Sequence, residues 1–81
     1  MNIELTDLEF RRLLDMAYIG NWVLNSTRGF DRFTDYDNVE SRLFSYCSSC
    51  GMSSLSDVIE GVSQPSEAFE NGGIHEAIAD Y

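Results

Sequence analysis

Two cysteines and a single histidine carry the most specific chemistry in this chain. Cys47 and Cys50 are separated by two residues, which is the spacing of redox dithiols and of half a zinc site, and His75 is a candidate third ligand. We expect the pair at the C-terminal end of a helix, where the helix dipole opposes a thiolate. A tetrahedral zinc site needs further ligands, and the sequence has no second CxxC. We therefore favour core packing for both thiols and expect no metal and no cofactor. The alternative is a metal-binding or redox role centred on Cys47, Cys50 and His75.

Sequence signatures of other catalytic sites are missing. The serine-rich stretch 48–56 has no Gly-x-Ser-x-Gly motif, and His75-Glu76 lacks the second histidine of a zinc protease. We expect that the protein is not an enzyme.

Carboxylates dominate the charge of the chain. Fourteen acids stand against five arginines and no lysine, which gives a net charge of −9. Residues 1–50 hold eight acids and five arginines, whereas residues 51–81 hold six acids and no base. This balance argues against direct binding to nucleic acid or to an anionic membrane, because both require a basic surface. It favours a basic protein surface as the partner.

We expect the interacting acids around the start of the second helix and in the C-terminal third. In residues 5–25, arginines lie at pairing distance from the acids, so that face should be nearly neutral. Around the second helix only Arg32 and Arg42 lie close enough in sequence to neutralise carboxylates. The candidate interaction residues are Asp31, Asp35, Asp37, Glu40, Glu67 and Glu70.

The segment around which the chain is organised is residues 5–25, which the sequence predicts to be one amphipathic helix. Thr6 and Glu9 fit a capping box, and apolar residues then recur at helical spacing as far as Leu24. Gly20 interrupts this helix at a cost of about 1 kcal/mol relative to alanine. Close approach of another helix over Gly20 would explain it, and the alternative is a kink or an early helix end near Asn21.

A second helix is predicted over residues 35–50. Its apolar residues follow spacings of three and four. Gly51 stands where a left-handed C-cap belongs, and Met52 stands where a Schellman ending has its apolar contact.

The remaining elements are expected to be short helices. One begins near Ser54 and runs through Ile59 to Gly61, and another spans residues 65–70 before the stop at residues 71–73. The last apolar stripe is still running at the end of the sequence, and consists of Ile74, Ala77, Ile78 and Tyr81. Either this stripe docks as a final helical turn or the chain is the front part of a longer one.

These elements predict a single all-α domain over residues 1–81: a small bundle of two longer antiparallel helices, with two or three short helices over their seam. No apolar run reaches the length of a membrane span, and the N-terminus lacks the pattern of a signal peptide. We therefore expect a cytoplasmic protein.

Two segments resemble a group of small bacterial and phage-type proteins that have no established activity. The first begins at Leu5-Thr6 and continues to Glu9-Phe10, and the second runs from Tyr18 through Trp22 to Asn25. The resemblance covers mainly the first fifty residues, with a fainter similarity at 73–78. It implies a microbial cytoplasm, and some similar chains run on past the position of Tyr81. It implies no activity, no cofactor and no catalytic residue.

Our leading hypothesis is a non-enzymatic protein-interaction or regulatory module, such as a phage-type inhibitor, whose acidic face engages a basic partner. Besides the metal or redox alternative, a homo-oligomeric structural protein is a third hypothesis, because a second copy, as in a homodimer, could cover the wide apolar seam of residues 5–25.

Overall fold

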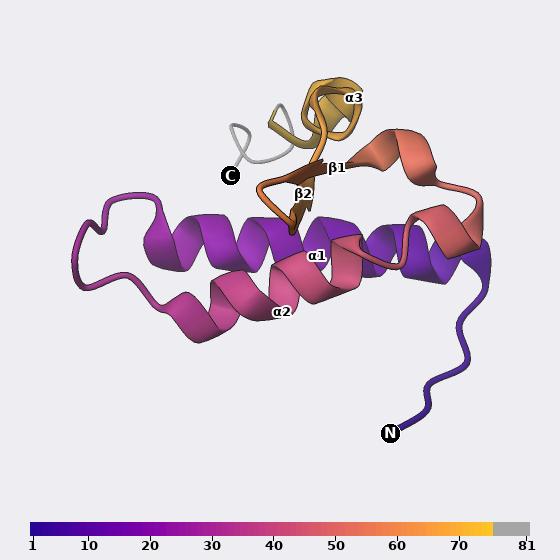
Figure 1. The fold of residues 1–81 in the computed structure, drawn as a ribbon, viewed down its shortest axis with the longest axis horizontal. Helices are drawn as coiled ribbons and strands as arrows, with labels where there is room; N and C mark the ends of the chain where they lie inside the picture. The colour runs from indigo at the N-terminus through magenta and orange to yellow at the C-terminus, as the bar shows by residue number, and fades with distance from the viewer. Residues whose placement is uncertain (76–81) are drawn as a thin grey trace.

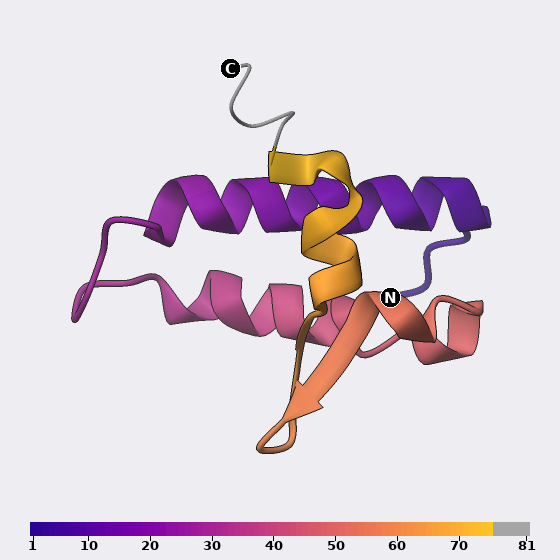
Figure 2. The ribbon, with the colours of Figure 1, turned by 90° about the horizontal axis from the view of Figure 1, so that it is seen from above.

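A pair of antiparallel helices forms the base of the fold. The computed structural model of the protein describes residues 1–75. Helices α1 (Asp7–Asn25) and α2 (Thr34–Phe44) lie side by side and run in opposite directions (Figure 1). A hairpin of β1 (Ser56–Ile59) and β2 (Val62–Pro65) follows, and a short helix, α3 (Glu67–Phe69), comes after it. The hairpin and α3 lie on one side of the helix pair (Figure 1), and from above α3 crosses the space between α1 and α2 (Figure 2).

The start of α1 is fixed by the predicted capping box. The Glu9 amide donates to the Thr6 hydroxyl at 3.1 Å, and the Thr6 amide donates to the Glu9 carboxylate at 2.9 Å. These two bonds satisfy amides that a helix start otherwise leaves without partners. The helix then runs without interruption through Gly20 to Asn25, so the alternative of an early end near Asn21 is wrong.

Helix α2 is shorter than the predicted 35–50. It begins at Thr34 and ends at Phe44, after which the chain makes separate 3-10 turns at Ser48–Cys50 and Ser53–Leu55. The predicted left-handed residue is present, because Gly51 has a φ of 73°. The Met52 amide donates to the Cys47 carbonyl at 2.8 Å, which is the long bond of a Schellman ending. The ending therefore closes the turn that contains both cysteines rather than α2 itself.

The all-α prediction is wrong, because residues 56–65 form a two-stranded antiparallel sheet. Ser56 pairs with Pro65 and Ile59 with Val62, so a two-residue loop joins the strands. Both loop residues have positive φ, 53° at Glu60 and 79° at Gly61, as in a type I′ turn. Of the short helix predicted from Ser54 through Ile59, only the 3-10 turn Ser53–Leu55 forms, and residues 56–59 are strand, which β-branched side chains such as Val58 and Ile59 favour.

Helix α3 lies within the predicted 65–70 helix but is shorter. Pro65 ends β2, and Ser66 caps α3 by accepting from the Phe69 amide at 3.3 Å. A wide turn, Glu70–Ile74, follows, and Gly73 leaves helical geometry with a φ of 99°. Of the last apolar stripe, Ile74 is buried. Residues 77, 78 and 81 lie outside the described part of the chain.

The core lies where α3 crosses the helix pair. The ring of Phe69 packs edge-on against Tyr18 of α1 and Phe44 of α2, with centroid distances of 5.3 and 5.0 Å. Seven buried apolar residues make up this core: Phe10, Leu14, Tyr18, Phe44, Cys47, Phe69 and Ile74. One side of the helix pair is thus covered by the second half of the chain.

Candidate interaction surface

A polar cluster fixes α1 against the start of α2. The Asn25 side chain accepts from the Phe33 amide at 2.6 Å and donates to the Phe33 carbonyl at 3.2 Å. One turn earlier, the side-chain amide of Asn21 donates to the carboxylate of Asp37 at 2.9 Å and to that of Glu40 at 3.1 Å. Both asparagines are buried, and they extend the buried stripe of α1 beyond Tyr18. Their spacing of four on that stripe is the sequence signal for this role.

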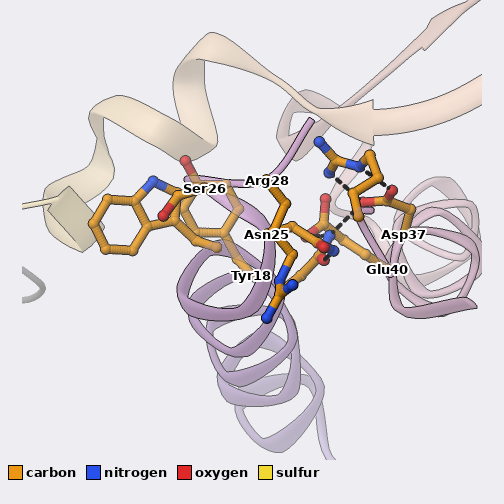
Figure 3. Close-up of a pocket in the computed structure, with 9 residues that line it drawn as sticks. Tyr18, Asn25, Ser26, Arg28, Asp37 and Glu40 are labelled. Carbon is orange, nitrogen blue, oxygen red and sulfur yellow. Dashed lines mark hydrogen bonds and ion pairs between the residues drawn. The ribbon is translucent and has the colours of Figure 1, made fainter. Parts of the chain in front are cut away.

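The cluster borders a pocket of about 350 Å³ between α1, α2 and their connection. Figure 3 shows Asp37 and Glu40 of α2 turned toward Asn25 of α1. Arg32 binds both carboxylate oxygens of Asp37, at 2.6 and 2.7 Å. In the described residues every buried side-chain nitrogen and oxygen has a hydrogen-bond partner. The hydrogen bonds from Asn21 to Asp37 and Glu40 at the edge of this pocket therefore link α1 to α2.

The two carboxylates of the cluster have opposite pKa shifts. Burial raises the pKa of Glu40, with Asp37 and Glu70 acting in the same direction and Asn21 and Arg32 opposing. Hydrogen bonds from Arg32 hold the pKa of Asp37 below its usual range, although burial acts against them.

The structure divides the six acids predicted to interact. Asp31 is paired with Arg28 at 3.0 Å and Asp37 with Arg32, whereas Glu40 is half-buried. From the sequence, we expected only Arg32 and Arg42 to neutralise these carboxylates. Arg28 was not expected to do so, but it pairs with Asp31, three residues later in the α1–α2 connection. Asp35 and Glu67 are exposed, and Glu70 is half-buried. The structure therefore does not bring the six together as one uncompensated cluster.

The residues weighed as metal ligands are separated by their packing. Cys47 is fully buried in the core, and burial raises the pKa of its thiol. Cys50 is half-buried, and neither cysteine is in a disulfide. His75 lies against α1, with its Nε2 3.0 Å from the Tyr18 hydroxyl. Within residues 1–75 no three histidine, cysteine, aspartate or glutamate side chains are placed to share a metal ion.

An apolar groove follows the side of α1 that the hairpin and α3 leave open. Its first part, about 430 Å³, is lined by apolar residues of the N-terminal segment and early α1: Ile3, Leu5, Leu8, Leu13 and Met16. Its second part, about 230 Å³, lies between α1 and α2 and is lined mainly by Met16, Ala17, Gly20, Leu24, Tyr36 and Val39. Met16 lines both parts, so the two hollows adjoin at its side chain, and together we call them the open-face groove.

Helix geometry explains why the open-face groove stays uncovered. At 3.6 residues per turn, Gly20 lies about 120° around α1 from Leu14, which is completely buried. Met16 and Val39 are 69% and 57% exposed, although both are large and apolar. The sequence predicted an apolar stripe on residues 5–25 wide enough for a second molecule to cover, but it did not indicate which side of the helix stays open. Gly20 was the sequence signal that lies within this surface.

Comparisons with known proteins add no family to this description. No protein-family model matches the chain, and neither the curated proteins nor the solved structures yield a match. Among residues 1–75, none of the helices combines the length and the hydropathy needed to cross a bilayer.

Proposed function

We propose that this protein is a non-enzymatic interaction module that binds a basic protein through the open-face groove. One observation carries the proposal: two adjoining apolar hollows along α1, which the described residues of the chain leave exposed. Large exposed apolar patches on small proteins mark binding surfaces, because burying them against a partner removes them from water. Met16 lies at the centre of this surface.

The charge around the groove supports a basic partner. Glu4, Glu9, Asp35 and Glu40 lie in or next to the segments that line it. The one guanidinium in its lining, that of Arg12, is paired with Asp15 at 3.2 Å. The whole chain adds a net charge of −9, which attracts a basic surface and repels an acidic one.

Affinity capture from an extract of the source cell tests this function. The wild type is compared with Met16→Lys, which places a positive charge at the centre of the groove. The matched control is Val58→Lys on the hairpin, because Val58 is 70% exposed, close to the 69% of Met16. We expect a basic protein to be retained by the wild type and by Val58→Lys, and to be lost with Met16→Lys.

Capture that Met16→Lys leaves unchanged would refute the proposal, as would a partner that is not basic. Retention should also weaken as salt rises from about 20 mM to about 200 mM, because the Debye length shortens over that range.

A further inference from the structure

We infer that the part of the partner that enters the open-face groove is a basic amphipathic helix, seated over Gly20. This inference rests on the proposed function and names the partner element that the groove fits. A helix laid into an apolar groove is a recurring mode of recognition, with apolar anchors on one face and polar residues on its flanks.

Gly20 is the first support. It lies in the interior of α1, where glycine costs about 1 kcal/mol relative to alanine. A Cβ at this position would meet no atom within 4 Å in the described part of the chain. Packing within residues 1–75 therefore gives no reason for a glycine. A second helix crossing here would give one, because packed helix axes lie only about 8–10 Å apart and small residues permit the closest approach.

The dimensions of the groove are the second support. From Leu8 to Leu24 it follows α1 for sixteen residues, or about 24 Å at 1.5 Å per residue. Tyr36 and Val39 of α2 form the opposite wall of its second part. A helix of about four to five turns would fill this length and complete a bundle of three helices.

Charge decides between a foreign helix and a second copy of this chain. A symmetric dimer through this groove would bring the same surface of both copies together. It would bring together two groove surfaces that each include Glu9 and Glu40, in two molecules that each carry −9. Lysines and arginines on the flanks of a foreign helix would instead meet these carboxylates with opposite charge.

A synthetic peptide tests the inference directly. The probe has about 18 residues, with leucine and alanine at i, i+3, i+4 and i+7 and lysine elsewhere. One control peptide has the same composition in an order that breaks the helical period, and another replaces lysine with glutamate. Binding of the labelled peptides to the full chain is followed by fluorescence anisotropy.

Gly20→Leu is the decisive variant, because its side chain would occupy the part of the groove over residue 20, where the partner helix should lie. Leucine also has a higher helix propensity than glycine, so we expect the fold to be retained. Gly29→Leu is its matched control: Gly29 lies in the α1–α2 connection, its Cβ also meets nothing within 4 Å, and it does not line the groove. We expect the basic amphipathic peptide alone to bind the wild type and Gly29→Leu, and Gly20→Leu to weaken that binding by about tenfold or more.

Three results would overturn the inference. They are no binding of the basic amphipathic peptide to the wild type, equal binding to Gly20→Leu, or a self-association that Gly20→Leu abolishes, which would give the groove to a second copy. Capture of the native partner by the two groove variants shows whether the inference alone is wrong or the proposed function is wrong as well. Capture lost with Met16→Lys but kept with Gly20→Leu refutes the seated helix alone, whereas capture indifferent to Met16→Lys refutes both.

Discussion

Gly20 has a measurable effect on the free protein as well as on binding. Replacement with alanine adds a Cβ into open space on α1 and removes the backbone entropy cost of glycine. We expect Gly20→Ala to raise the free energy of unfolding by about 0.5–1 kcal/mol, measured by urea denaturation. Gly51→Ala is the contrasting control, because Gly51 has a φ of 73°, and it should lower that free energy. A destabilised Gly20→Ala would mean that α1 needs glycine for its own packing.

The half-buried carboxylate of Glu40 predicts a pH-dependent stability. Because burial raises the pKa of Glu40 in the folded state, its stabilising contribution is complete below the ordinary glutamate pKa. That contribution is lost as the pH rises through the raised value, where the folded state must hold a buried charge. Glu40→Gln should therefore be more stable than the wild type at neutral pH, with the difference shrinking in acid. Urea midpoints at about pH 7 and about pH 4 measure this change.

Asp37, one helical turn earlier, should give stability the opposite dependence on pH. Arg32 lowers the pKa of Asp37, so the ionised carboxylate stabilises the fold above the ordinary aspartate pKa and loses that effect as the pH falls through the lowered value. Asp37→Asn should be less stable than the wild type at neutral pH and similar to it in strong acid. The same urea titrations apply, and parallel pH profiles for the two variants would contradict the assigned partners.

At the scale of elements, the hairpin depends on two residues. Gly61→Val places a β-branched residue at a φ of 79°, which costs about 1–2 kcal/mol. Glu60→Asn replaces a residue that rarely adopts its φ of 53° with one that tolerates it, and should be neutral or stabilising by up to about 1 kcal/mol. Thermal unfolding followed by circular dichroism measures both. Equal effects of the two substitutions would show that the turn does not limit stability.

Elements whose ends carry specific side chains could be predicted from the sequence. Thr6 and Glu9 predict the start of α1, because few residue pairs can form a capping box. Gly51 predicts a left-handed turn, because few residues other than glycine adopt a positive φ. The hairpin could not be predicted in the same way. Its loop is Glu-Gly rather than Asn-Gly, and the serines before it also suit a helix start. Local signals were ambiguous there, and pairing between strands decided the outcome.

The candidate surface was predictable only in part. The abundance of acids is a property of composition, but their pairing depends on how the α1–α2 connection places Arg28 beside Asp31 and Arg32 beside Asp37. The open-face groove depends on which side of α1 the hairpin and α3 cover. Periodicity places Met16 and Gly20 on a helix but cannot say which side stays open.

For the molecule as a whole, the net charge of −9 predicts a dependence of stability on salt. Acids outnumber arginines, so mutual repulsion among carboxylates should outweigh the attraction within the surface ion pairs, which contribute little. We expect the midpoint of thermal unfolding to rise as sodium chloride increases from about 10 mM to about 150 mM, because salt screens that repulsion. A midpoint that falls would mean that the ion pairs, such as Arg32 with Asp37, dominate instead.

The contrast between the two thiols has a practical consequence. Cys50 is half-buried, and we expect it to react with a small alkylating reagent in the folded molecule. Cys47, three positions earlier, is completely buried in the core, and its thiol also has a raised pKa. We expect alkylation of Cys47 to require opening of the core, so that its rate relative to that of Cys50 reports how often the core opens. The native chain thus contains its own kinetic probe of opening, with an internal standard one helical turn away.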